Sequence, residues 1–185
     1  MTNELRDQLH DQPRDQPRDQ LWLQQRLTSV WQNHFSDMVA ANRVVIRFGR
    51  VARTRLGSIR MSRDKKISTI LINRLFQNSA VPPEVVEATI AHELVHYLHG
   101  FSSPFEQKFY SPHAGGVVTK ELKKRGFGEI LQRQKGWLKT EWPALVRAHA
   151  PVGVSRRYGV HGGASRGPRS RGVRRLVMRG LNRLF

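Results

Sequence analysis

Apolar residues recur every three or four positions in two stretches of the chain. From about Gln20 to Ala41 this spacing predicts an amphipathic helix whose apolar stripe faces a core. A second helix is predicted from Pro82 and Pro83 to Gly100, because proline suits the first turn of a helix and glycine its end. A third helix is predicted from about Val117 towards Gly126.

Shorter runs rich in valine and isoleucine lie between the first two predicted helices. Val44–Phe48 and Ile67–Ile72 are typical of strands, and Gly57–Ser62 is a candidate third strand. The polar run Arg63-Asp64-Lys65-Lys66 predicts a hairpin turn. The order of elements favours an α+β domain in which a small sheet packs on the second helix.

The two ends of the chain differ from this centre. Residues 1–19 contain a repeated Asp-Gln tetrapeptide and are predicted to be a disordered tail. Residues 20–150 form the predicted domain, and residues 151–185 a basic, flexible tail. Within that tail, Val173–Phe185 predicts a short basic amphipathic helix, which could bind an anionic membrane surface, a nucleic acid or a partner groove.

The second predicted helix carries the sequence His92-Glu93-Leu94-Val95-His96. Residues four apart share one face of a helix, so both imidazoles can reach one ion, and imidazole nitrogen suits Zn²⁺. A bound zinc lowers the pKa of its water to about 7, and Glu93 could accept a proton from that water. The alternative is a buried amphipathic helix whose histidines only form hydrogen bonds.

A catalytic zinc site needs a third protein ligand, which the motif does not contain. His99 lies on the same side as His92 but about 10 Å along the helix, too far to share one ion. His113 is the preferred candidate, because the segment from Gly100 to Pro112 could fold it back onto the helix. Glu106 and Glu121 remain as alternatives, although Glu121 lies among lysines where a helical ion pair is typical.

The residues from Val44 to Phe127 resemble the SprT-like metalloprotease domain, which is also found in Spartan. The resemblance rests on the predicted strands, on the stretch Arg53–Arg60, on the helix that ends in the His-Glu-x-x-His motif, and on a later histidine that opens the next helix. It implies a zincin-like fold with zinc bound by His92, His96 and His113. Glu93 would be the general base of a peptidase. A Gly-Ser segment before the helix is also similar to the YgjP-like metal hydrolases.

Composition narrows the setting of the protein. The chain has no cysteine, so it forms neither disulfides nor a thiolate zinc site, and this fits a reducing compartment. The first 20 residues lack the apolar core of a signal peptide, and no run approaches a transmembrane length. We therefore expect a cytoplasmic protein. Its oligomeric state has no sequence signal.

The net charge of +18 favours a polyanionic partner. Residues 142–185 contain ten arginines and no acid, and residues 20–141 contain 19 basic and 9 acidic residues. The tail arginines expected to contact nucleic acid are Arg156, Arg157, Arg169, Arg171, Arg174 and Arg175. A second set would form a phosphate-binding surface if it gathered on one face of the sheet: Arg47, Arg50, Arg53, Arg55 and Arg60.

Together these features predict a zinc-dependent metalloendopeptidase with a protein or peptide substrate, acting near DNA. DNA is one candidate among polyanions, because charge shows affinity for polyanions in general. The first alternative is a nucleic-acid-binding protein whose zinc site is structural or inactive. A further alternative is a protein that associates with a membrane surface through Val173–Phe185.

Overall fold

Three strands form a small mixed sheet in the computed structural model, which describes residues 17–149. The strands are β1 (Arg43–Phe48), β2 (Gly57–Met61) and β3 (Ile67–Ile72). Their order is β1-β3-β2, with β1 parallel and β2 antiparallel to β3. All three predicted strands are confirmed, and the segment from Arg63 to Lys66 forms the turn between β2 and β3.

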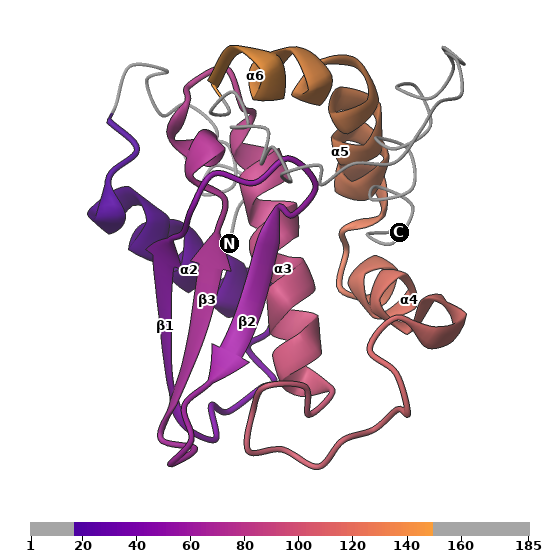
Figure 1. The fold of residues 1–185 in the computed structure, drawn as a ribbon. Helices are drawn as coiled ribbons and strands as arrows, with labels where there is room; N and C mark the ends of the chain where they lie inside the picture. Colours follow the sequence, from indigo (N-terminus) through magenta and orange to yellow (C-terminus); the bar gives the residue numbers. More distant parts are fainter. Residues whose placement is uncertain (1–16, 150–185) are drawn as a thin grey trace, which may run out of the picture.

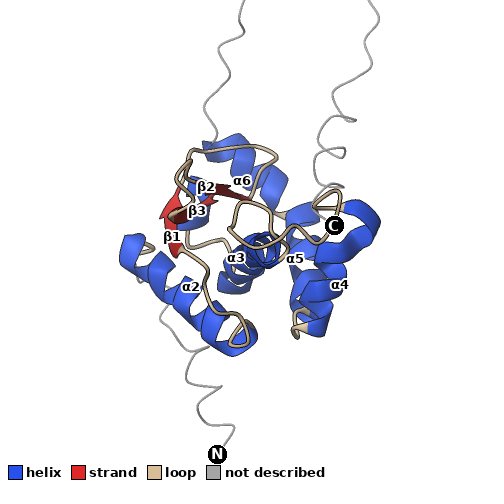
Figure 2. Ribbon diagram, turned by 90° about the horizontal axis from the view of Figure 1, so that it is seen from below, coloured by secondary structure: helices blue, strands red, loops and turns tan. Residues whose placement is uncertain are grey.

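The sheet has one buried and one open face. Helices α2 (Gln20–His34) and α3 (Pro83–Leu98) lie on one side of it (Figures 1 and 2). Ile46, Ile70 and Ile72 point to that side and are buried. Neighbouring positions on the strands alternate with these and are half-buried or exposed, as the side-chain period of two requires.

Helix α2 is shorter than its apolar spacing indicates. It begins after the N-cap Asp19, whose side chain accepts a hydrogen bond from the Trp22 amide, and it ends at His34 instead of continuing to Ala41. Beyond it, Phe35 and Met38 remain buried in a turn closed by a hydrogen bond from the Met38 amide to the Phe35 carbonyl, whereas Val39 is exposed. The apolar spacing therefore continued past the end of the helix.

Helix α3 is the central element of the fold. Pro83 occupies its first turn, as predicted, and Glu84 lies near its positive end, where a negative charge is favourable. It contacts α2, β2, β3 and the later helices, so its buried side chains extend around most of its circumference. This enclosure holds the motif histidines and Glu93 on a rigid support.

Within the described residues three helices follow α3, and the first two of them pack against it (Figure 1). Helices α4 (Val117–Lys124), α5 (Gly128–Thr140) and α6 (Trp142–His149) complete the fold, with short 3-10 turns η1 (Arg74–Gln77) and η2 (Ala114–Gly116). The class is α+β, as expected. No helix within residues 17–149 has the length and hydropathy needed to cross a bilayer.

Candidate metal centre

Two histidines of α3 project side by side from one face of the helix. The ring centroids of His92 and His96 are 4.7 Å apart. His96 is buried and His92 is partly buried. The four-residue spacing produces this arrangement because one helical turn separates the two side chains.

The chain then folds back and brings His113 to the same place. Gly100 makes the bend possible: its φ is +81°, and a Cβ there would overlap the backbone of Glu106. The returning loop is fastened to the end of α3 by the Ser103 hydroxyl, which donates to the Tyr97 carbonyl, and by the Lys108 amide, which donates to the His99 carbonyl.

The returned loop completes a cluster of three histidines. The ring centroid of His113 is 4.7 Å from that of His96 and 5.4 Å from that of His92. One potential ligand atom from each ring lies within 4.8 Å of the others. Four-coordinate zinc with bonds of about 2.0–2.1 Å holds its nitrogens about 3.3 Å apart, so modest ring rotations would bring all three onto one ion.

The environment of the rings favours the neutral, metal-binding form of imidazole. Burial lowers the pKa of His96 to about 4, with further lowering by His113 and His99. Burial, followed by the charges of His96 and His113, holds the pKa of His92 well below its usual range. Burial also lowers the pKa of the more exposed His113. The buried Nδ1 of His96 has no hydrogen-bond partner among the described residues, so one strong nitrogen donor is left for a ligand.

Glu93 follows His92 on α3 and is only 5% exposed. Burial raises the pKa of its carboxyl to about 8, and the charge of Arg55 acts in the opposite direction. A buried carboxyl with a raised pKa next to a cluster of metal-ligand type is a common arrangement in hydrolytic sites.

Gly57, the first residue of β2, forms a wall of the Glu93 environment. A Cβ at position 57 would lie 2.8 Å from the Glu93 Oε1 atom and 2.9 Å from the Thr89 Cγ2 atom. Neither this contact nor the effect of Arg55 on the pKa of Glu93 could be predicted from the sequence, because both depend on how β2 packs against α3. A glycine that opens a strand was the only available signal.

The other candidate ligands lie apart from the cluster. Glu106 and Glu121 do not belong to any described group of three or more possible ligands that includes the histidines. Glu121 instead forms an ion pair with Arg125 one turn later, at 2.7 Å. His99 is buried against Phe109, with ring centroids 4.8 Å apart, and also stands outside the cluster.

The residues expected to contact nucleic acid fall into two groups. Arg156, Arg157, Arg169, Arg171, Arg174 and Arg175 lie outside the described residues, as does the predicted helix Val173–Phe185. Near the sheet, Arg50, Arg55 and Arg60 line one cavity, whereas Arg47 and Arg53 are not among its lining residues. Trp142 is buried and donates to the Arg53 carbonyl at 2.9 Å, so it is not free to stack on a base.

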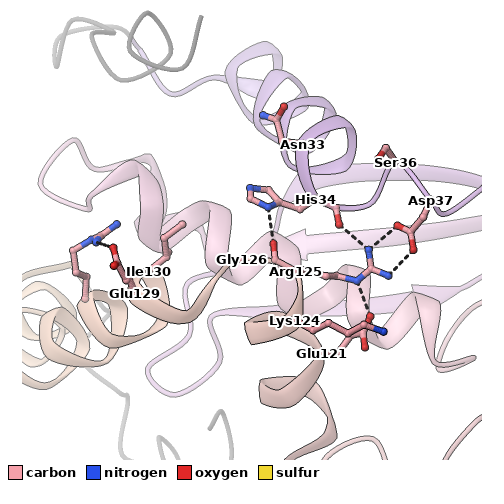
Figure 3. Close-up of a pocket in the computed structure, with 11 residues that line it drawn as sticks. Asn33, His34, Ser36, Asp37, Glu121, Lys124, Arg125, Gly126, Glu129 and Ile130 are labelled. Carbon is pink, nitrogen blue, oxygen red and sulfur yellow. Dashed lines mark hydrogen bonds and ion pairs between the residues drawn. The ribbon is translucent and has the colours of Figure 1, made fainter. Parts of the chain in front are cut away.

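A second cavity, of about 1000 Å³, opens where the end of α2 meets α4 and α5 (Figure 3). Its central charge, Arg125, donates to both carboxylate oxygens of Asp37, to Glu121 and to the His34 carbonyl. These bonds satisfy the guanidinium with groups of the protein. The cavity is therefore a junction between elements, with its main cation already engaged.

The histidine cluster and Glu93 are the chemically distinctive group of the described residues. No protein-family model, curated protein or solved structure matched this chain. The function is therefore argued from the geometry of this group.

Proposed function

We propose that the protein is a zinc metalloendopeptidase of the SprT-like kind. The observation that carries the proposal is the convergence of His92, His96 and His113, with the buried Glu93 next to His92 in the chain. A set of three protein ligands is one short of four-coordinate zinc, and a fourth position taken by water or substrate is the pattern of catalytic zinc sites.

The donor set fits zinc chemically, although imidazoles also bind copper, nickel and iron. When bound, the ion would act as a Lewis acid that polarises a peptide carbonyl, and it would lower the pKa of a bound water to about 7. His92 and His96 would hold it from the rigid face of α3. His113 would close the site from the loop.

In this proposal Glu93 would move the protons. Its carboxyl would accept a proton from the attacking water and deliver that proton to the nitrogen of the departing amine. The pKa of about 8 refers to the protein without an ion, and an adjacent divalent cation would lower it because positive charge favours the carboxylate. A lowered pKa would make Glu93 a base at neutral pH.

Strand β2 offers a place for an extended substrate. Within the described sheet it pairs with β3 on one side only, and it begins at Gly57, against Glu93. A peptide could add to the other side of β2 through main-chain hydrogen bonds. Such binding reads the backbone, so cleavage with little sequence preference is expected.

The proposal is tested with Glu93→Gln and His113→Ala in the full-length chain. Zinc per chain is measured by elemental analysis, and proteolysis is followed on fluorescently labelled casein. The wild type is expected to bind about one zinc and to cleave casein. Glu93→Gln should keep the zinc and lose at least about 100-fold in rate, the usual scale of a general base. His113→Ala should lose both.

Two results would contradict the proposal: casein cleavage retained by Glu93→Gln, or wild-type protein that binds no zinc. A third ligand other than His113 would appear as zinc retained by His113→Ala and lost by His92→Ala. The same protein samples also distinguish a peptidase from the alternative function. A nucleic-acid-binding protein with a structural zinc site, which the high basic content favours, would bind zinc and DNA but leave casein intact.

We further propose that the substrates of the peptidase include proteins associated with DNA. If the basic surface brings enzyme and substrate together on DNA, duplex DNA should accelerate proteolysis, and the acceleration should fade as salt rises. Equal rates with and without DNA at low salt would contradict the DNA-associated substrate and would not affect the peptidase proposal.

A further inference from the structure

The sheet region carries an unusual excess of positive charge. Residues 43–74 contain ten basic side chains and a single acid, Asp64. Within the described part of the chain, the ion pairs involve other residues, and none of the basic side chains of this region takes part in one. Apart from Arg55, whose charge acts on Glu93, these side chains can therefore direct their charge at a partner.

The loop between β1 and β2 is held in a fixed shape by the buried side chain of Asn73. Its amide donates to the carbonyls of Ala52 and Arg55, each at 2.7 Å. The Asn73 backbone amide donates to the Leu56 carbonyl at 2.8 Å. On the far side of the loop, the Trp142 indole donates to the Arg53 carbonyl. These bonds fix the backbone from which several arginines extend.

The fixed loop and the ends of the strands enclose a cavity of about 570 Å³. Four exposed arginines line it: Arg50, Arg55, Arg60 and Arg74. Ser58 and Leu71 also line it; they are partners across the β2–β3 ladder, on positions alternate to the buried Ile70 and Ile72. Ser58 and Leu71 place one side of the cavity on the face of the sheet turned away from α3, whereas Gly57 and the buried Ile72 line its inner end.

Strand β1 extends the same basic face. Arg47 pairs in register with Leu71, and Arg43 lies two pleats earlier on the same side. Both are exposed. The open face therefore combines a pocket of four arginines with two more along the neighbouring strand.

We propose that this face, from Arg43 and Arg47 to the cavity of Arg50, Arg55, Arg60 and Arg74, binds the phosphate backbone of duplex DNA. Guanidinium groups form paired hydrogen bonds with phosphate, and a fixed loop loses little entropy on binding. Phe48 is the single aromatic residue that lines the cavity, so the face lacks the row of aromatic side chains on which successive bases of a single strand stack. The face does not include the histidine cluster, although Arg55 and Gly57 at its cavity also border Glu93, and the proposal does not rest on peptidase activity.

The test uses the full-length chain in the Glu93→Gln background, so that no proteolysis interferes. The variant Arg50→Gln/Arg60→Gln/Arg74→Gln removes three exposed charges from the face and leaves Arg55, near Glu93, in place. The control Lys120→Gln/Lys123→Gln/Lys139→Gln removes three exposed charges from α4 and α5. Binding to a fluorescein-labelled 20-base-pair duplex of mixed sequence is measured by anisotropy between 50 and 200 mM NaCl.

The arginine variant should bind at least about tenfold more weakly at 100 mM NaCl. Its slope of log affinity against log salt should fall by about 2–3, since each phosphate contact contributes about 0.9. The control should change affinity by less than about twofold. Equal losses in the two variants would overturn the proposal, because binding would then follow net charge alone.

Two further probes complete the test. Tighter binding to the matching single strand than to the duplex would overturn the assignment to duplex DNA. Binding to phosphatidylserine vesicles that is lost in the arginine variant, with duplex binding unchanged, would reassign the face to membranes. Because the protein used is proteolytically inactive, none of these results depends on whether the peptidase proposal holds.

Discussion

Gly57 leaves the space that the Glu93 carboxylate occupies. In Gly57→Ala the new methyl group would meet the Glu93 Oε1 atom and Thr89, and Glu93 or the start of β2 would have to move. We expect the free energy of unfolding to fall by about 1–3 kcal/mol, the usual cost of overpacking. Casein cleavage should fall at least about tenfold while zinc content is unchanged. Urea unfolding, elemental analysis and the casein assay measure the three quantities.

Gly136 provides the matched control. It lies inside α5, and a Cβ there would meet nothing within 4 Å. Gly136→Ala should leave activity unchanged and stabilise the protein by up to about 1 kcal/mol, because alanine is the better helix former. Similar activity losses in both variants would show that the close contact at position 57 has no special role.

The predictability of the site differs from residue to residue. The proximity of His92, Glu93 and His96 follows from the sequence, since helical geometry alone places them together. The position of His113 required an assumption about the loop after Gly100, and only its return path, fixed by Ser103 and Lys108, decides it. The Gly57–Glu93 contact joins two elements far apart in the chain and has no local signature.

Asp37 links stability to pH through Arg125. The hydrogen bonds from Arg125 hold the pKa of Asp37 below its usual range. A lowered pKa in the folded state means that the pair stabilises the protein above the unfolded pKa of about 3.9, and that this stability is lost as pH falls through the folded pKa. Asp37→Asn should therefore reduce the free energy of unfolding at pH 7, by less than about 1 kcal/mol for so exposed a pair.

The measurement for Asp37→Asn is urea unfolding from pH 7 to pH 2.5. The difference between variant and wild type should shrink steadily below about pH 4. A difference that is constant over this range would assign the effect to something other than the ionised carboxylate.

At the scale of elements, α2 and α3 are joined by a largely buried ion pair. Arg26 Nη1 lies 3.1 Å from Glu87 Oε1, and the Arg26 Nε atom is buried without a hydrogen-bond partner among the described residues. Glu87→Ala would leave the arginine charge in a poorly solvated place. We expect a loss of about 3 kcal/mol in the free energy of unfolding, at the lower end for such pairs because Glu87 retains some exposure.

The double variant Arg26→Met/Glu87→Leu distinguishes charge burial from packing. It removes both charges and keeps apolar volume between the helices, so it should recover most of the loss in urea unfolding. A double variant as unstable as Glu87→Ala would show that the helices depend on the pair itself.

Helix α2 shows where sequence patterns stop being informative about elements. Its start near Gln20 was readable from the first apolar positions, but its end was not. Phe35 and Met38 keep the spacing of a helix because a tight turn places them in the same core. Burial is therefore encoded in the pattern, whereas the backbone path at a helix end depends on local hydrogen bonds that the pattern does not contain. The three strands were readable because their valine and isoleucine runs end at glycine or charged residues.

At the scale of the whole molecule, metal binding should stabilise the fold. The three histidines come from α3 and from the loop before α4, so one ion would hold these segments together. Zinc at about 100 times its dissociation constant should contribute about 2.7 kcal/mol. For a chain of this size that corresponds to a rise in Tm of about 5–10 °C. Thermal unfolding of chelator-treated protein, with and without added zinc, measures it.

In the same experiment His113→Ala should show a much smaller rise. A rise equal to that of the wild type would place the stabilising zinc elsewhere in the chain.

The one-sided pairing of β2 also has a consequence for how molecules of this protein meet one another. A strand with an unpaired edge can align with the same strand of a second molecule and begin a continuous intermolecular sheet. Here Arg60, Arg63 and Lys65 lie on or just beyond β2, so two such edges repel each other. This repulsion is electrostatic, and added salt weakens it because counterions shorten its range. Dilute, low-salt solutions should therefore keep the protein dispersed, and concentrated salt should be the first condition in which it aggregates.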